Sequence, residues 1–96
     1  MYRIIGGRGT GKTNQLMLLA KESGATIVCS NPRAMQQKAH VYGITGITGI
    51  DFISYGEFTP DAVRGDDKTY LVDELEEYLG FLLGNKRIAG YTMSEE

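Results

Sequence analysis

The sequence predicts an α/β fold in which a mainly parallel sheet of about five strands lies between two layers of helices. Two observations lead to this prediction. Short β-rich segments alternate with longer segments of helical periodicity, and a glycine-rich turn joins the first strand to the first helix. In such three-layer α/β/α folds, ligands bind at the carboxyl ends of the strands. We therefore expect the functional residues to follow the strands directly.

The chain length, 96 residues, predicts a single domain over residues 1–96, with residues 94–96 as a frayed tail. No apolar run approaches the roughly 20 residues of a membrane span, and the N-terminal residues lack the pattern of a secretory signal. We therefore expect a cytoplasmic protein without a membrane partner. The formal net charge of −2 neither requires nor excludes a nucleic acid. Cys29 is the only cysteine, which excludes an internal disulfide, and its apolar neighbours predict that it is buried.

Capping signals predict two helices in the first half of the chain. The first runs over residues 12–23 and stops at Gly24. The second runs over residues 32–42, with Asn31 as its cap and a proline in its first position.

The remaining segments are predicted as strands, one further helix and loops. The strands are residues 2–5, 25–29, 50–55, 70–72 and 87–93. Leu75, Tyr78, Leu79 and Leu82 mark an amphipathic helix between the last two strands. Residues 43–50 and 59–68 are predicted as a loop and a polar connection.

The glycine-rich turn matches the pattern G-x-x-x-x-G-K-[ST] of a phosphate-binding loop, the Walker A motif or P-loop. The nucleotide-binding residues predicted here are Gly6, Gly7, Arg8, Gly9, Thr10, Gly11, Lys12, Thr13 and Asn14. Glycines let backbone N–H groups wrap a triphosphate closely, where a β-carbon would block the approach. We expect Lys12 to reach the β- and γ-phosphates and the Thr13 hydroxyl to be a ligand of Mg²⁺.

The fourth predicted strand ends in two carboxylates, Asp73 and Glu74, the pattern called Walker B. A rigid strand would hold Asp73 beside Thr13 as a second protein ligand of Mg²⁺. Glu74 would then act as the general base on the attacking water. Because acidic residues are also favoured in the first turn of any helix, this interpretation depends on the phosphate-binding loop.

With these two motifs the chain resembles the P-loop NTPases, over nearly its whole length. Within them it is similar to the branch with an added strand and a catalytic glutamate, which includes the RecA-like ATPases and the superfamily 1 helicases. The resemblance implies ATP as the nucleotide and Lys12 and Glu74 as catalytic residues. It also implies a sensor of the γ-phosphate on the last strand, for which Thr92 and Ser94 are the candidates.

Residues 52–58 are similar in placement to a helicase segment that touches single-stranded DNA. Tyr55 or Phe58 would then stack on a base; the alternative is that both are core aromatics.

The chain departs from the helicases because it has room for only one of the two lobes that close on ATP. Vigorous hydrolysis would need an arginine from another copy of the chain or from a partner protein, since such a residue is worth about 10³ to 10⁵ in rate. Arg33, Arg64 and Arg87 are the candidates.

The sequence therefore predicts a minimal ATP-binding protein of helicase or translocase ancestry. Alone it would be a weak hydrolase, and assembly or nucleic acid would stimulate it. Two alternatives stay open. One is a non-enzymatic regulatory or interaction module that the nucleotide stabilises or switches. The other, less favoured because the chain is short for a lid and an acceptor site, is a small nucleotide kinase.

Overall fold

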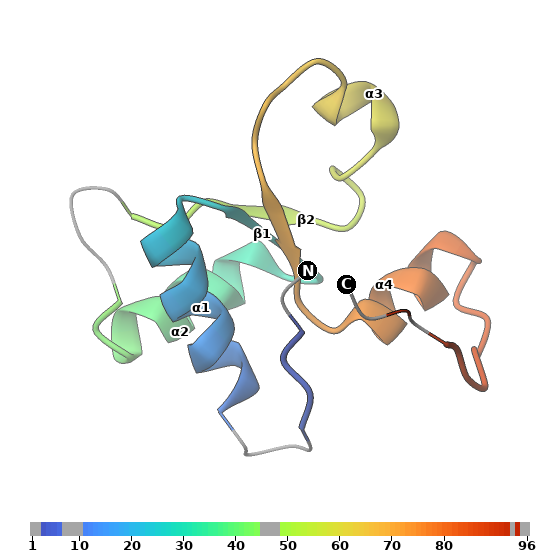
Figure 1. The fold of residues 1–96 in the computed structure, drawn as a ribbon, viewed down its shortest axis with the longest axis horizontal. Helices are drawn as coiled ribbons and strands as arrows, with labels where there is room; N and C mark the ends of the chain where they lie inside the picture. Colours follow the sequence, from blue (N-terminus) through green and yellow to red (C-terminus); the bar gives the residue numbers. More distant parts are fainter. Residues whose placement is uncertain (1–2, 7–10, 45–48, 93, 95–96) are drawn as a thin grey trace.

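The computed structural model describes residues 3–6, 11–44, 49–92 and 94, and Figure 1 shows their arrangement. Helices and strands alternate along these residues. They are α1 (Lys12–Ser23), β1 (Thr26–Cys29), α2 (Pro32–Val41), β2 (Phe52–Ser54), α3 (Pro60–Val63), β3 (Tyr70–Val72) and α4 (Leu75–Leu82). The predicted α/β class is confirmed.

The three strands form one parallel sheet in the order β2, β1, β3. β1 lies in the centre, with Ile27 opposite Phe52 of β2 and Leu71 of β3. All four residues of β1 are buried, as expected for a parallel strand covered on both faces. Because the strands are parallel, their carboxyl ends meet at one edge of the sheet, and the residues that follow them lie close together there.

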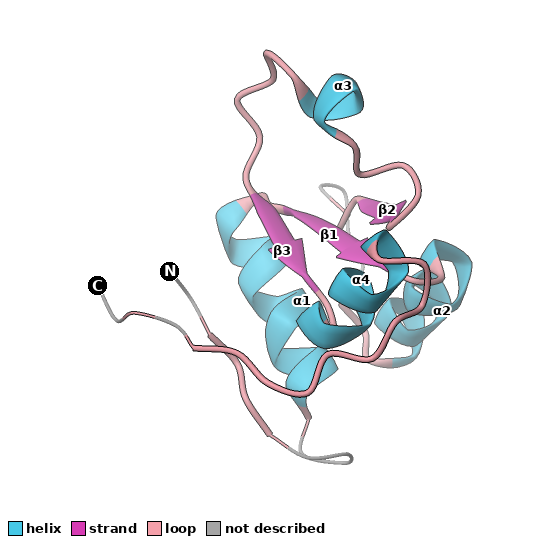
Figure 2. Ribbon diagram, turned by 90° about the vertical axis from the view of Figure 1, so that its right-hand side faces the viewer, coloured by secondary structure: helices cyan, strands magenta, loops and turns pink. Residues whose placement is uncertain are grey.

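Helices lie on both sides of this sheet, and α1 and α2 are the ones that pack against its strands. Figures 1 and 2 show α1 and α2 on one face and α4 on the other, near the carboxyl ends of the strands. The main core lies between the sheet and the first pair of helices; it comprises Leu16, Met17, Ala20, Ile27, Cys29, Met35, Ala39 and Ile44. Val28 alternates with Ile27 and Cys29 along β1 and is fully buried as well.

The helix boundaries agree with the capping signals in the sequence. α1 occupies the predicted residues and ends at Gly24, whose φ of 75° is the left-handed conformation that glycine adopts easily. At the start of α2 the Asn31 side chain accepts a hydrogen bond from the Ala34 amide at 3.2 Å. Gly43, also at positive φ, follows the end of α2.

The sheet is smaller than the predicted five strands in the described part of the chain. Residues 3–6 and 86–92 form no strand, while residues 2 and 93 of the predicted first and last strands lie outside the described ranges. A strand exists only where a neighbouring strand completes its backbone hydrogen bonds. Ile4 packs against the core, but Ile5 is 84% exposed, so the apolar pattern of the first segment does not lead to pairing.

The polar connection predicted over residues 59–68 contains the short helix α3. Its start carries a recognisable signal, because Thr59 accepts a hydrogen bond from the Ala62 amide at 3.2 Å and a proline follows in the first position. The predicted loop over residues 43–50 is described only at its two ends.

Cys29 is 1% exposed, which confirms the prediction of a buried cysteine. Desolvation, together with the negative charge of Asp73, raises the pKa of its thiol to about 11. The thiol therefore stays protonated at neutral pH and serves as packing.

Within the described ranges, no helix has the length and the apolar character needed to cross a membrane.

Candidate functional site

The acidic pair predicted from the sequence lies at the carboxyl end of β3. The Asp73 amide donates to the Val28 carbonyl at 2.9 Å, so the pairing of β3 with β1 continues one residue beyond the strand. Glu74 follows at the start of α4 with φ 56° and ψ 70°, a left-handed conformation that is uncommon for a residue other than glycine. The backbone bends at these two residues, between the end of β3 and the start of α4.

The amino terminus of α1 supplies the other half of the site. Gly11 precedes the helix at φ 79°, and none of the described side chains caps the first turn, which also contains no acidic residue. Side chains do cap α2 and α3. The first-turn amides of α1 and the positive end of its dipole therefore suit an anion. Gly6 and Gly11 border the predicted phosphate-binding loop, whereas Gly7, Arg8, Gly9 and Thr10 lie outside the described residues.

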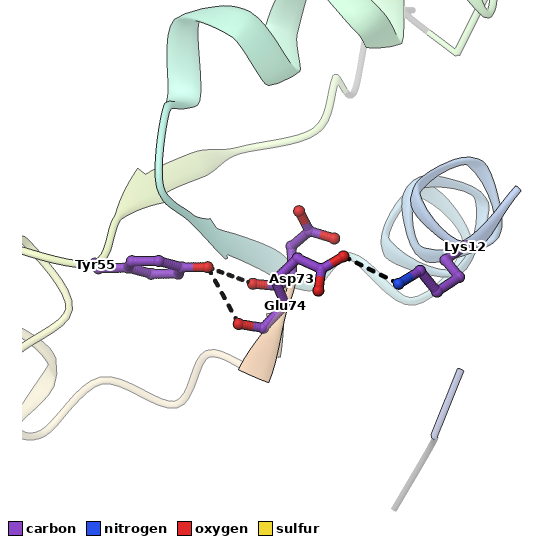
Figure 3. Close-up of polar contacts among 4 residues, drawn as sticks. All are labelled: Lys12, Tyr55, Asp73 and Glu74. Atoms are coloured by element: carbon purple, nitrogen blue, oxygen red, sulfur yellow. Dashed lines mark hydrogen bonds and ion pairs between the residues drawn. The ribbon is translucent and has the colours of Figure 1, made fainter. Parts of the chain in front are cut away.

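An ion pair joins these two halves. The Lys12 ammonium lies 3.1 Å from Oε1 of Glu74, a residue 62 positions later in the chain. Both side chains are partly exposed, at 27% for Lys12 and 47% for Glu74, so water screens the pair. Figure 3 shows the Lys12 ammonium directed at the carboxylate across the space between α1 and the end of β3. The fold thus brings together the two residues predicted to be catalytic.

Asp73 lies in a setting that favours a nearby cation. Partial burial and the adjacent Glu74 raise the pKa of its carboxyl group, against the opposing effect of Lys38 and Lys12. A carboxylate that is costly to keep charged is stabilised when it coordinates a metal ion. Thr13, on the first turn of α1, is the second predicted ligand and is partly buried. Mg²⁺ takes few protein ligands and completes its shell with water and phosphate oxygens, and a site for it on Thr13 and Asp73 stays a prediction.

The described residues contain no group of three His, Cys, Asp or Glu side chains placed to hold a metal ion by themselves.

We expect Asp73→Asn to raise the melting temperature of the protein in the absence of nucleotide and magnesium at pH 7. The raised pKa means that the folded state disfavours the charged carboxylate, and asparagine removes this penalty. The gain should shrink as the pH falls toward the unfolded-state pKa of about 3.9, because the wild-type carboxyl group is then neutral in both states. Thermal melts from pH 7 downward measure it. Asp67→Asn, the same change at an exposed position, is the control, and an equal gain there would contradict the interpretation.

A cavity of about 480 Å³ adjoins this site along the outer edge of β3. Its lining is mainly apolar and comes from residues 3–5, α1, β3 and Tyr91, with Lys12, Asp73 and Glu74 at one end. Arg3 and Tyr91 line the cavity too, and no pattern in the sequence marks them as functional. Neither carries a local signal, because the fold alone brings them beside β3.

The other predicted site residues lie elsewhere or stay untested. Thr92 and Ser94 are exposed, and Tyr91 lines the cavity instead, so a sensor role for either stays a prediction. Arg64 pairs with Asp61 on α3 at 3.3 Å, with both side chains largely exposed. Arg33 and Arg87 are exposed as well. None of these three arginines lines the cavity beside Lys12.

The aromatic residues after β2 pack against other aromatic side chains. Tyr55 is 5% exposed, and its ring lies 5.2 Å from that of Tyr78. Phe58 packs against Tyr70 and Tyr78 with ring centroids 4.9 and 5.7 Å apart. The interpretation as a core aromatic is confirmed for Tyr55. Phe58 is half-buried, so a base-stacking role for it stays a prediction.

Comparison with protein-family models, curated proteins and solved structures gave no match.

Proposed function

We propose that the chain binds a nucleoside triphosphate, ATP foremost, with Mg²⁺ at the junction of α1 and β3, and hydrolyses it slowly. The observation that carries this proposal is the ion pair between Lys12 and Glu74 at 3.1 Å. It joins the last part of the phosphate-binding loop to the end of the acidic strand, the two motifs that the sequence alone identifies. A chance glycine-rich turn gives no reason for its lysine to meet a strand-end carboxylate 62 residues away.

Each residue has a defined part in the proposed reaction. Lys12 leaves Glu74 and binds the phosphates, whose negative charge replaces that of the carboxylate. Thr13 and Asp73 would hold Mg²⁺, which would supply positive charge beside the phosphate oxygens. Glu74, released from Lys12, accepts a proton from the water that attacks the γ-phosphorus. The bond from that phosphorus to the β–γ bridging oxygen breaks, and the nucleoside diphosphate leaves. Opening of the ion pair is thus coupled to binding, and the carboxylate becomes free as the phosphates arrive.

Binding is tested with Lys12→Ala, using a fluorescent ATP analogue and Mg²⁺. We expect roughly 10-fold to 100-fold weaker binding, since a hydrogen bond between charged groups is worth about 1.5–3 kcal/mol. ATP at 100 times its Kd should also stabilise the wild type by about 2.7 kcal/mol in thermal unfolding. Lys21→Ala, at the exposed far end of α1, removes the same charge and should change neither measurement. If the wild type does not bind, or if both variants bind like it, the proposal is wrong.

Measurement of ATP hydrolysis distinguishes a hydrolase from a regulatory module that binds the nucleotide without hydrolysing it. We propose that a neighbouring copy, a partner protein or single-stranded DNA raises the slow rate, because one lobe lacks the arginine that a second lobe supplies. Specific activity that rises steeply with protein concentration supports an arginine from another copy. Binding without turnover at any concentration, with and without DNA, identifies a regulatory module instead.

A further inference from the structure

The hydroxyl of Tyr55 contacts the backbone of the acidic pair. It donates to the Asp73 carbonyl at 2.7 Å and lies 3.3 Å from the Glu74 carbonyl. Tyr55 follows β2, which is separated from β3 by the central strand, so this contact spans the carboxyl ends of the whole sheet. Figure 3 shows Tyr55 and Lys12 approaching the acidic pair from opposite sides.

The position of Tyr55 is fixed by its surroundings. Its amide donates to the Cys29 carbonyl at 3.0 Å, which ties its backbone to β1. Its ring packs against Tyr78 and Phe81 of α4, with centroids 5.2 and 5.9 Å away. Burial is the main cause that raises the pKa of the hydroxyl, which therefore remains a hydrogen-bond donor throughout the physiological range.

The contact acts on a backbone conformation that needs support. Glu74 has φ 56°, where a side chain crowds its own backbone, and a residue other than glycine holds such a conformation only if its surroundings impose it. No side chain caps α4 at this point. The Tyr55 hydroxyl binds the two carbonyls on either side of the Glu74 amide and Cα, so it restricts the torsion angles that set the direction of the Glu74 side chain.

We propose that Tyr55 is a positioning residue for Glu74. Its hydroxyl holds the backbone of Asp73 and Glu74 so that the Glu74 carboxylate stays where it meets Lys12 and, once a nucleotide is bound, the attacking water. This inference rests on the proposed function only for its catalytic part. The conformational part, that Tyr55 holds the backbone of Glu74, applies to the nucleotide-free protein and does not depend on the proposed function.

The catalytic part is tested with Tyr55→Phe, which removes the hydroxyl and keeps the ring. We expect kcat to fall by about 10-fold to 10²-fold with KM nearly unchanged, because small displacements of a catalytic group are costly whereas phosphate binding by Lys12 is retained. Tyr70→Phe is the matched control, since it removes another tyrosine hydroxyl, one bonded to the exposed Asp66 carboxylate at 2.7 Å. In a Glu74→Gln background, Tyr55→Phe should cause no further loss. Wild-type kcat in Tyr55→Phe, or an equal loss in both backgrounds, would overturn the proposal.

The conformational part is tested by NMR of the nucleotide-free protein. A positive φ brings the amide and α hydrogens of a residue close together, so Glu74 should give a strong intraresidue cross-peak between them in the wild type and in Tyr70→Phe. In Tyr55→Phe we expect this cross-peak to weaken. An unchanged cross-peak overturns the positioning role, whether or not the wild type hydrolyses ATP. A different result is a wild type that does not hydrolyse ATP together with a weakened cross-peak in Tyr55→Phe. That result would reject the hydrolytic function but keep Tyr55 as the residue that sets the conformation of Glu74.

Discussion

We expect Glu74→Gln to lower the rate of ATP hydrolysis by about 10² to 10⁴, the usual contribution of a general base. Glutamine has nearly the same shape but cannot accept the proton of the attacking water. Nucleotide binding should be kept, and should even become up to a few-fold tighter. Lys12 no longer has a carboxylate partner at 3.1 Å in the variant, and exposed pairs of this kind are worth about 0.2–1 kcal/mol. Single-turnover hydrolysis and equilibrium binding measure the two effects separately.

The control is Glu76→Gln, which removes the same charge from an exposed position in the first turn of α4. It should leave both the rate and the affinity close to those of the wild type. Weaker binding in Glu74→Gln would contradict the competition between Glu74 and the phosphates for Lys12. An unchanged rate would remove Glu74 from the mechanism.

Ile27→Ala should have the largest effect on stability, lowering the free energy of unfolding by about 2–5 kcal/mol. Ile27 is fully buried in the central strand, opposite both Phe52 and Leu71, so truncation leaves a cavity between the sheet and its covering helices. Since small domains have a total stability of about 5–15 kcal/mol, this loss would unfold a large share of the molecules well below the wild-type melting temperature. Urea unfolding followed by circular dichroism measures it.

Ile5→Ala is the matched control because Ile5 is 84% exposed. The same truncation should change stability by no more than about 0.5 kcal/mol, as for most surface substitutions. If the two variants lose equal stability, the N-terminal segment contributes to the core as strongly as the central strand does.

The sequence predicted best what short-range signals determine. The ends of α1 and α2 follow from Gly24, Asn31 and the proline after it, whose conformations depend on neighbours within a few residues. The strand before Asp73 was predictable because three apolar residues stop abruptly at two carboxylates. The sequence also placed Lys12 and Glu74 at the same edge of the sheet, where parallel strands and the helices that follow them converge. It predicted no contact between their side chains, and the structure alone gives the ion pair.

Long-range features could not be predicted in the same way. Whether residues 3–6 and 86–92 pair with β3 depends on the register and distance of another segment, which an apolar pattern does not encode. The left-handed conformation of Glu74 had no signal, because glutamate rarely adopts it. The role of the Tyr55 hydroxyl depends on a contact between two strand ends that are not neighbours in the sheet. Tyr55 was predicted as a core or base-stacking aromatic, and neither interpretation used its hydroxyl.

The outer edge of β3 bears on how the protein avoids aggregation. The Thr69 carbonyl and the Asp73 amide bond to β1, so by alternation Tyr70 and Val72 direct their backbone groups outward. An uncovered strand edge offers these groups to any other chain and can start uncontrolled association of sheets. β3 has only three residues. The segments that contain Ile4 and Tyr91 line the cavity beside this strand. A foreign strand would gain few hydrogen bonds and would have to displace both segments, so the shortness of β3 and its two neighbours protect the molecule where its sheet is incomplete.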